Sequence, residues 1–368
     1  MHSHWVEIML AKRESKLVRI GEVPVGGGSP VSVQSMTKTQ TDDVGATVAQ
    51  IRQLEEAGCE IVRCAVPDEA AALALREIKA QIRIPLVADV HFRHELALMA
   101  LENGADALRI NPGNIGGRER VEEVARAALE RGVPIRIGVN SGSLEKELRQ
   151  EIEQAAPDER GGAVAKAMAE SARKHIGILE ELDFHSIIVS LKSSDVPTTV
   201  QAYRLMADLC DYPFHIGVTE AGSVLSGAVK SAVGLGILLN EGLGDTIRIS
   251  LTGPAEDEVR VGYMILRALG LRERGPEVIS CPTCGRCQID LVNLVEEVER
   301  GIAGVDDAVK VAVMGCVVNG PGEARDADLG IAGGKGSGVL FRSGEIVRKV
   351  KEGELAQTLI REVRRMTE

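Results

Sequence analysis

The chain has 368 residues, of which 44% are apolar and 26% charged, a composition typical of a globular protein and unlike that of a disordered or collagen-like chain. Its 54 acidic and 43 basic residues give a net charge of −11, and it contains one Trp, three Tyr and four Phe. Nucleic-acid-binding proteins usually carry an excess of basic residues or aromatic side chains that stack on bases, so this class is excluded.

The start of the chain, MHSHWVEIMLAKRESK, lacks the apolar core of a signal peptide, and no apolar run approaches the about 20 residues of a membrane span. We therefore expect a cytoplasmic protein with neither a membrane nor a nucleic-acid partner. In a reducing compartment, its seven cysteines are interpreted as metal-binding or catalytic residues before they are interpreted as disulfide partners.

The first part of the chain repeats a β-then-α pattern. Residues 14–28 predict a hairpin, of the kind that closes the bottom of other barrels. Eight short β-branched segments then alternate with stretches of helical periodicity, and they begin at Ser29, Cys59, Ile84, Ala105, Pro134, Ser186, Pro213 and Thr246. Eight such units predict an α/β fold, a TIM (β/α)8 barrel over residues 1–270. A doubly wound sheet is the alternative, but no GxGxxG motif follows the first strand.

Alternation within the predicted strands places polar residues on one face. In the strand PIRIGVN, for example, Arg136, Gly138 and Asn140 share a face and the aliphatic residues share the other. The apolar face has to contact the surrounding helices, so the polar face points into the barrel. Five cations are expected inside the barrel or at its rim: Arg63, Arg109, Arg136, Lys192 and Arg248. Asp89 and Glu220 cannot neutralise all five.

Unpaired buried cations are very costly, so this set predicts a polyanionic ligand, most simply a diphosphate, at the C-terminal mouth of the barrel. The alternative is that the cations form structural ion pairs with acidic neighbours. Phosphate-dependent protection against thermal unfolding distinguishes the two interpretations.

After about residue 271 the β-then-α pattern stops, and residues 271–368 predict a small α/β domain. Its expected elements are a helix after the cysteines, strands at 309–316 and 329–334, a hairpin at 337–347 and a terminal helix around 354–366. At this length the segment is large enough to be a domain of its own.

Four cysteines in this second segment indicate a metal centre. The spacing Cys281-x-x-Cys284 brings two thiolates close together, and Cys316 follows a predicted strand. With Cys287, these residues could supply four ligands to zinc or to a [4Fe–4S] cluster. Glu323 offers instead an oxygen ligand that is easier to displace, which suits an iron that must accept substrate. Two ligand sets remain open, one with Cys287 and one with Glu323.

The sequence resembles the bacterial 4-hydroxy-3-methylbut-2-enyl diphosphate synthase family over nearly its whole length. The resemblance rests on ten segments in order: VSVQSMT, EIVRCAVP, ADVHF, RINPGN, RIGVNSGSLE, SLKSSDV, HIGVTEAG, IRISLTG, CPTCGR and GCVVNGPGEA. It implies a TIM barrel followed by a [4Fe–4S] domain. The implied reaction is the reductive ring opening and dehydroxylation of 2-C-methyl-D-erythritol 2,4-cyclodiphosphate to 4-hydroxy-3-methylbut-2-enyl diphosphate, in the methylerythritol phosphate route to isoprenoids.

The resemblance also implies the roles of individual residues. The implied cluster ligands are Cys281, Cys284, Cys316 and Glu323. The implied substrate-binding residues are Arg63, Arg109, Arg136, Lys192 and Ser250, with Asp89, His91, Asn111, Asn140 and His215 nearby. Glu220 is expected to be the general acid that assists the loss of water, from a position shielded from solvent. Cys287 departs from the family pattern and is not expected to be a ligand.

The implied partners are flavodoxin or ferredoxin as electron donor and a second copy of the chain, in a homodimer where the cluster domain of one copy covers the barrel of the other. Two interpretations from other classes remain. One is a zinc-stabilised barrel aldolase acting on a phosphosugar, with Lys192 as the Schiff-base residue, and the other is a binding protein with a structural metal module. An iron–sulfur protein would be brown and bleached by dithionite, whereas a zinc protein would be colourless.

Overall fold

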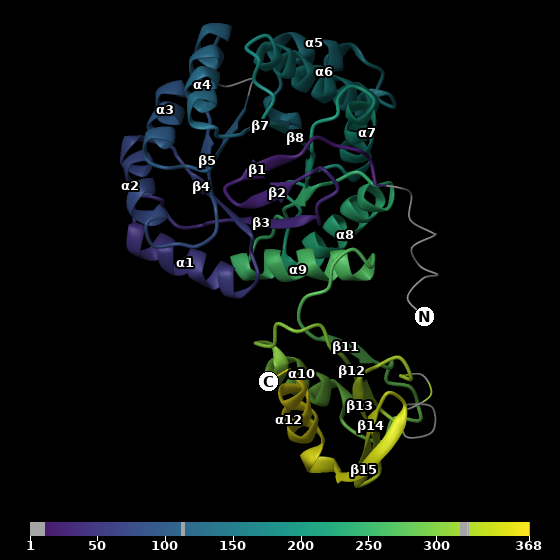
Figure 1. Ribbon diagram of the computed structural model, residues 1–368. Helices are drawn as coiled ribbons and strands as arrows, with labels where there is room; N and C mark the ends of the chain where they lie inside the picture. The colour runs from purple at the N-terminus through teal and green to yellow at the C-terminus, as the bar shows by residue number, and fades with distance from the viewer. Residues whose placement is uncertain (1–11, 112–114, 317–321, 323, 368) are drawn as a thin grey trace. The chain divides into compact units, whose positions relative to one another are not determined.

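The computed structural model describes residues 12–111, 115–316, 322 and 324–367, and the chain divides into two units, Met1–Arg272 and Glu273–Glu368 (Figure 1). Each unit has its own sheet and its own apolar core.

Eight parallel strands form a closed barrel in the first unit. Their hydrogen-bonded order is β8-β7-β6-β5-β4-β3-β10-β9, and a parallel bridge between Val189 and Phe214 closes the ring. The strands are β3 (Ser32–Met36), β4 (Ile61–Ala65), β5 (Leu86–Val90), β6 (Ala107–Ile110), β7 (Ile135–Asn140), β8 (Ile187–Lys192), β9 (His215–Ile216) and β10 (Thr246–Ile247). Every one lies within a segment that the sequence predicted to be a strand, and the TIM barrel is confirmed.

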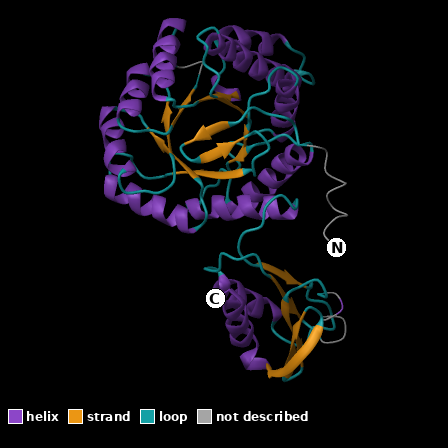
Figure 2. Ribbon diagram, in the orientation of Figure 1, coloured by secondary structure: helices purple, strands orange, loops and turns teal. Residues whose placement is uncertain are grey.

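Helices surround this ring of strands (Figure 2). They are α1 (Val44–Glu56), α2 (Glu69–Lys79), α3 (His94–Glu102), α4 (Arg118–Arg131), α5 (Lys146–Gln154), α6 (Arg160–Glu180), α7 (Val196–Ala207), α8 (Val224–Asn240) and α9 (Ala255–Ala268). The carboxylates of Asp43, Asp68 and Asp195 accept hydrogen bonds from backbone amides at the starts of α1, α2 and α7. Gly132 ends α4 with a φ of 64°, the left-handed conformation in which glycine is favoured.

The N-terminal hairpin closes the amino-terminal end of the barrel. Strands β1 (Val18–Ile20) and β2 (Val23–Val25) pair antiparallel and lie across the ring of strands in Figure 2. The hairpin residues Val18, Ile20 and Val25 pack in one apolar cluster with the first inward-facing side chains of four barrel strands: Ile61, Val87, Ala107 and Ile188. The lower layer of the barrel interior is therefore apolar, and its polar contents lie nearer the carboxyl ends of the strands.

A five-stranded mixed sheet forms the second unit, in the order β11-β12-β13-β14-β15. Its elements are β11 (Glu277–Ser280), α10 (Leu291–Ile302), β12 (Lys310–Met314), β13 (Leu329–Gly334), β14 (Ser337–Arg342), β15 (Glu345–Lys351) and α12 (Leu355–Thr367). The first three strands are parallel, and the last two pairs are antiparallel. The apolar faces of α10 and α12 pack against the same face of the sheet. Strand β11 was not predicted, because it is short, nowhere fully buried, and shows no apolar alternation.

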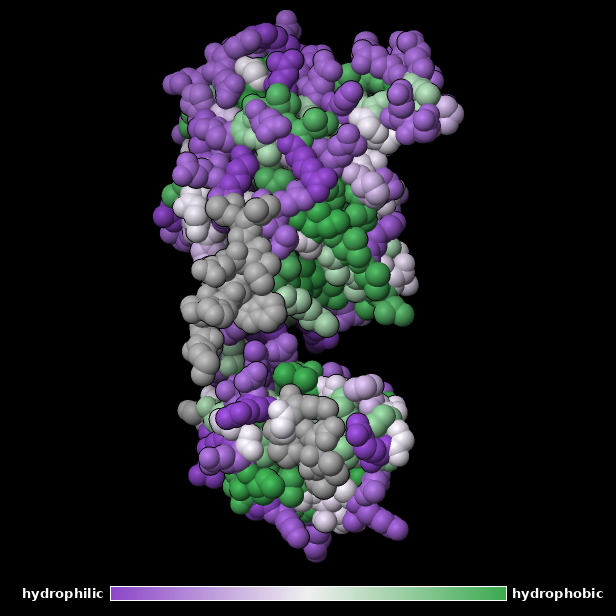
Figure 3. All heavy atoms as spheres, turned by 90° about the vertical axis from the view of Figure 1, so that its right-hand side faces the viewer, coloured by the Kyte–Doolittle hydropathy of each residue, from purple (hydrophilic) through white to green (hydrophobic). Residues whose placement is uncertain are grey.

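Apolar side chains also gather on the outside of the first unit. On α8, Leu225, Val229 and Val233 follow one another at intervals of four residues, and each exposes more than half of its surface. The side of the barrel unit seen in Figure 3 shows broad apolar areas between hydrophilic ones. No helix among the described residues is both long enough and apolar enough to span a bilayer.

Candidate functional site

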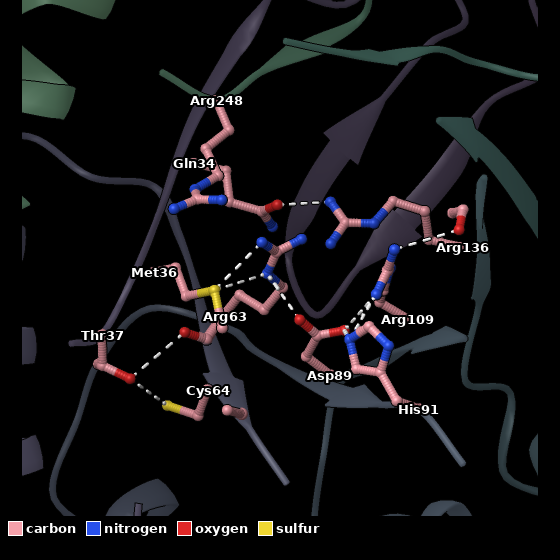
Figure 4. Close-up of polar contacts among 12 residues, drawn as sticks. Gln34, Met36, Thr37, Arg63, Cys64, Asp89, His91, Arg109, Arg136 and Arg248 are labelled. Carbon is pink, nitrogen blue, oxygen red and sulfur yellow. Dashed lines mark hydrogen bonds and ion pairs between the residues drawn. The ribbon is translucent and has the colours of Figure 1, made fainter. Parts of the chain in front are cut away.

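The upper barrel interior is lined by cations that alternate mainly with aliphatic residues along the strands. Arg63, Arg109, Arg136 and Lys192 each expose less than a tenth of their surface, and Arg248 is partly exposed. Figure 4 shows the guanidinium groups of the four arginines converging on one region. The alternation that predicted this set holds, because each residue has buried aliphatic neighbours that face the surrounding helices.

Asp89 connects three of the inward-facing residues. Its carboxylate lies 3.0 Å from Arg109 Nη1 and 3.4 Å from Arg63 Nε, and His91 Nε2 lies 2.7 Å from the same Arg109 nitrogen. Burial alone would raise the pKa of Asp89, but the charges of Arg63 and Arg109 and the hydrogen bond with His91 lower that pKa well below its ordinary value. Asp89 therefore stays ionised.

The position of Arg109 depends on a glycine. Arg109 Nη2 donates a hydrogen bond to the Gly138 carbonyl at 3.1 Å. A Cβ at Gly138 would lie 2.3 Å from Arg109 Nε, so any other residue here would displace the guanidinium. At Gly217 a Cβ would lie 2.5 Å from the Arg248 carbonyl oxygen and 3.0 Å from Lys192 Nζ, so this glycine admits both the neighbouring backbone and the lysine. Glycines on the inward faces of β7 and just after β9 thus make room for the cations.

Arg136, Lys192 and His215 are held with few partners. Arg136 Nη1 donates to Gln34 Oε1 at 2.6 Å, whereas Arg136 Nε and Nη2 and His215 Nδ1 are buried without a hydrogen bond among the described residues. Lys192 Nζ lies 3.1 Å from His215 Nε2. Burial, reinforced by the neighbouring cations, lowers the pKa values of all three groups well below their ordinary values.

Two carboxylates contact three of the five cations. Asp89 contacts Arg63 and Arg109, and Glu258 Oε2 lies 3.7 Å from Arg248 Nη2; these are the carboxylates within ion-pair distance of the set in the part of the chain that the structure describes. The alternative of fully paired structural ion pairs is therefore not observed. A site with surplus buried donors suits an anionic ligand with several oxygens.

Sequence reasoning missed Glu258 and gave the second carboxylate as Glu220. Glu258, in the first turn of α9, is almost fully buried. Its carboxylate accepts hydrogen bonds from Ser35 Oγ at 2.9 Å and from the Leu251 amide at 3.1 Å, and it lies 3.3 Å from Lys38 Nζ. A signal was present, because Glu258 lies three residues after Ala255 and four before Gly262, on the buried face of the helix. Gln34 was missed too, although it shares one face of the strand VSVQSMT with Ser32 and Met36.

The remaining expected residues lie at or beyond the carboxyl ends of the strands. Asn111 is buried and donates to Ser143 Oγ at 2.7 Å, while Asn140 ends β7 and Ser250 follows β10, both half-buried. Glu220 follows β9 with a φ of 51°, a conformation that is uncommon for a residue with a side chain. Its side chain is exposed, so the barrel unit does not supply the shielding from water that the sequence analysis expected.

The four cysteines of the second unit follow the carboxyl ends of two neighbouring strands. Cys281 comes directly after β11, and Cys316 follows β12 by two residues. These strands are parallel and pair Ser280 with Val313, so their ends meet at one edge of the sheet. The Gly315 amide donates to Cys281 Sγ at 3.3 Å. We name this region, Cys281 to Cys287 with Gly315 and Cys316, the cysteine edge.

The cysteine edge has the chemistry of a thiolate site. Cys284 is exposed, and hydrogen bonds from the backbone and the guanidinium of Arg286 lower the pKa of its thiol, which favours a metal ligand. Cys287 is half-buried, and its thiol donates to the Ile289 carbonyl at 3.3 Å. A sulfur that accepts an amide hydrogen bond and a neighbouring thiol of lowered pKa fit the cysteine ligation of an iron–sulfur cluster.

The full ligand set is not described by the structure. Glu323 lies outside the described residues, and within them no three Cys, His, Asp or Glu side chains are gathered closely enough to hold one ion. The choice between Cys287 and Glu323 as fourth ligand stays a prediction.

Known families match both units. The model of the GcpE TIM-barrel domain matches residues 15–263, and that of the GcpE protein C-terminal domain matches residues 277–365. The 4-hydroxy-3-methylbut-2-en-1-yl diphosphate synthase (flavodoxin) of Geobacter sulfurreducens is 62% identical over 355 residues, which cover 96% of this chain and 98% of the relative. The protein of the same name from Clostridium perfringens is 56% identical over 350 residues, covering 95% and 98%.

Two solved structures resemble about two thirds of the chain in fold. A dihydropteroate synthase of Coxiella burnetii, in complex with pteroic acid, aligns with a TM-score of 0.51 at 10% identity, over 70% of this chain and 100% of that one. The Stenotrophomonas maltophilia dihydropteroate synthase gives a TM-score of 0.50 at 15% identity, over 70% and 98%. At such identities the likeness is one of fold only.

Proposed function

The chain belongs to the 4-hydroxy-3-methylbut-2-en-1-yl diphosphate synthase family, and we propose on this premise that it converts 2-C-methyl-D-erythritol 2,4-cyclodiphosphate reductively to 4-hydroxy-3-methylbut-2-enyl diphosphate. It is an oxidoreductase of isoprenoid precursor synthesis. Membership decides between this reaction and a phosphosugar aldolase, the alternative that the sequence left open.

One observation supports a cyclic diphosphate as the substrate. Five cations line the upper barrel and meet only two carboxylates among the described residues, and Arg136 keeps two buried nitrogens unpaired. A cyclic diphosphate supplies the missing negative charge and oxygen acceptors. Planar guanidinium groups bind such oxygens in pairs, and Lys192 adds a single charge. The barrel residues that bind it are Arg63, Arg109, Arg136, Lys192 and Ser250, with Asp89, His91, Asn111, Asn140 and His215 beside them.

Glu220 is proposed as the general acid. It lies beyond the carboxyl end of β9, the end of a TIM barrel at which active sites are found, and its unusual φ of 51° is a strain typical of functional positions. Hydrogen bonding from the Thr219 amide to the Ser193 carbonyl, at 3.2 Å, joins this segment to the residues after β8. The carboxyl group would protonate the departing hydroxyl as water.

The cysteine edge is proposed to hold a [4Fe–4S] cluster through Cys281, Cys284, Cys316 and Glu323. When bound, such a cluster supplies the two electrons of the reaction one at a time. Within the chain, Arg286 stabilises the Cys284 thiolate and the Gly315 amide stabilises the sulfur of Cys281. These contacts prepare two of the ligands for binding.

A flavodoxin, the donor in the names of the relatives, is proposed to reduce the enzyme, with ferredoxin as the alternative. We also propose a cytoplasmic homodimer. The apolar stripe of Leu225, Val229 and Val233 on α8 is a surface that a second copy would cover, since monomers rarely expose large apolar patches.

Turnover under anaerobic conditions tests the function. The purified protein should be brown, should lose its visible absorbance on reduction with dithionite, and should form the dehydroxylated diphosphate from the cyclic one. Glu220→Gln should keep the visible spectrum and lose turnover, because only the proton donor is removed. A fully active Glu220→Gln variant would refute the role of Glu220, and a colourless protein without turnover would refute the function.

A further inference from the structure

A row of exposed lysines borders the sheet of the second unit. Lys349 and Lys351 lie on β15, the edge strand, and Lys335 lies in the turn between β13 and β14. All three side chains are exposed, and none has an ion-pair partner among the described residues. We call these three residues the basic strip.

The basic strip is unusual in so acidic a chain. From residue 335 to residue 351 there are five basic residues and one acidic residue, Glu345, whereas the whole chain has a net charge of −11. Two of the five, Arg342 and Arg348, lie 3.9 and 3.8 Å from Glu362 of α12. The three lysines of the basic strip form no ion pair within the described part of the chain, although the Glu352 carboxylate, which accepts from the Gly336 amide at 3.0 Å, offsets part of their charge.

The basic strip lies at the same end of the sheet as the cysteine edge. Strand β13 is parallel to β12, and β14 and β15 reverse direction in turn, so the carboxyl end of β12, the start of β14 and the end of β15 lie at the same end of the sheet, with β13 and β14 between β12 and β15. Lys351 pairs in register with Ser337, at the start of β14. Two hydrogen bonds complete the connection: the Lys335 amide donates to Gln288 Oε1 at 3.1 Å, and the Gln288 amide donates to the Gly315 carbonyl at 3.4 Å.

Exposed apolar residues accompany the lysines. The register with β14 pairs Lys349 with Val339 and Ile346 with Phe341, so Ile346, which exposes 62% of its surface, shares a face of β15 with Lys349. Val347, at the irregularity between them, exposes 56%. Apolar side chains flanked by charges of one sign are typical of small, transient complexes such as those of electron-transfer proteins. Lysines on an edge strand also prevent pairing with other sheets, so the experiment below has to separate this role from binding.

We propose that the basic strip, with Val347 and Ile346, is the surface on which an acidic flavodoxin docks to deliver electrons to the cysteine edge. The inference rests on the proposed function, since that function assigns a cluster to the cysteine edge and a flavodoxin as donor. Opposite charges would steer the donor to this edge and orient its flavin toward the cysteines. Proximity matters because the rate of electron transfer falls steeply with distance.

The test is the double variant Lys349→Glu/Lys351→Glu in the full holoenzyme. Its matched control, Arg300→Glu/Lys310→Glu, makes the same change of charge at the opposite end of the sheet, where α10 ends and β12 begins. Each protein is assayed with reduced flavodoxin and, separately, with dithionite and methyl viologen, a small reductant that needs no docking surface. Binding of oxidised flavodoxin is measured by calorimetry at two salt concentrations.

Docking at the basic strip predicts that the double lysine variant raises the KM for flavodoxin, and its dissociation constant, about tenfold or more at low salt, with a weaker salt dependence. Its viologen-driven turnover should equal that of the wild type, and the control should bind flavodoxin normally. Unchanged flavodoxin binding in the lysine variant would overturn the inference, and so would an equal loss in the control or an equal loss with viologen. Failure of the wild type itself with viologen would instead count against the proposed function.

Discussion

Replacing Glu258 by Gln tests how much this buried carboxylate stabilises the cations at the carboxyl end of the barrel. The buried carboxylate accepts from Ser35 Oγ and the Leu251 amide and lies near Lys38 and Arg248. The amide side chain of the variant would retain an oxygen acceptor but would leave both cations without their counter-charge. Removing one partner of a fully buried ion pair costs about 3–5 kcal/mol.

The expected cost is smaller than that, because the side chains of Lys38 and Arg248 are 35% and 15% exposed and water screens part of their charge. We expect a loss of about 2–3 kcal/mol, which for a unit of this size lowers the melting temperature by about 4–10 °C. Thermal unfolding followed by circular dichroism measures the change. Glu256→Gln, in the same helical turn, is the control for loss of a carboxylate near the start of α9.

The variant should also weaken substrate binding. Glu258 and Lys38 hold the backbone of Leu251, next to the proposed substrate residue Ser250, from its amide and its carbonyl. We expect KM to rise more than kcat falls, while the visible absorbance expected from the proposed cluster stays unchanged. If Glu258→Gln has the same melting temperature and the same KM as Glu256→Gln, Glu258 does not stabilise Lys38 and Arg248 as their counter-charge.

Three further predictions concern protons and sulfur. Burial and the neighbouring cations lower the pKa values of Lys192 and His215, and a bound polyanion would raise these pKa values again. Binding of pyrophosphate should therefore take up protons and weaken as pH rises. Calorimetry in two buffers of different ionisation enthalpy measures the proton uptake. Burial alone would raise the pKa of Glu145, but hydrogen bonds, the largest of them from His175, outweigh burial and lower this pKa to about 2. The ionised Glu145 therefore stabilises the fold above pH 4.5, and this stabilisation is lost as pH falls toward 2. In urea titrations, the difference in stability between the wild type and Glu145→Gln should shrink over that pH range. Cys287→Ser should retain the iron content of the wild type after anaerobic reconstitution, whereas loss of iron would make Cys287 a ligand in place of Glu323.

The sequence predicted much of the barrel interior because a β-strand alternates strictly. In a strand such as IRIGVN, one face must meet the surrounding helices, and only the aliphatic face can do so without burying charge. Arg63, Arg109 and Arg136 were therefore assigned to the interior before any contact was known, and the structure buries all three.

Contacts between segments far apart in the chain could not be predicted from the sequence. Helical periodicity marks Glu258 as a buried position of α9, but which cation its carboxylate compensates depends on how α9 packs against the barrel. Strand β11 was missed because its three half-buried residues and one exposed residue show no alternation, although this strand brings Cys281 to the same edge as Cys316.

By itself, then, the sequence determined the barrel, the two-part chain, the family resemblance and the identity of the inward cations, because each of these follows from local periodicity or from ordered motifs. Tertiary structure alone decided how those cations are compensated, which glycines make room for them and where the basic strip lies relative to the cysteine edge. Pairing of charges and strand ends depends on distances between segments far apart in the chain, and periodicity contains no information on such distances.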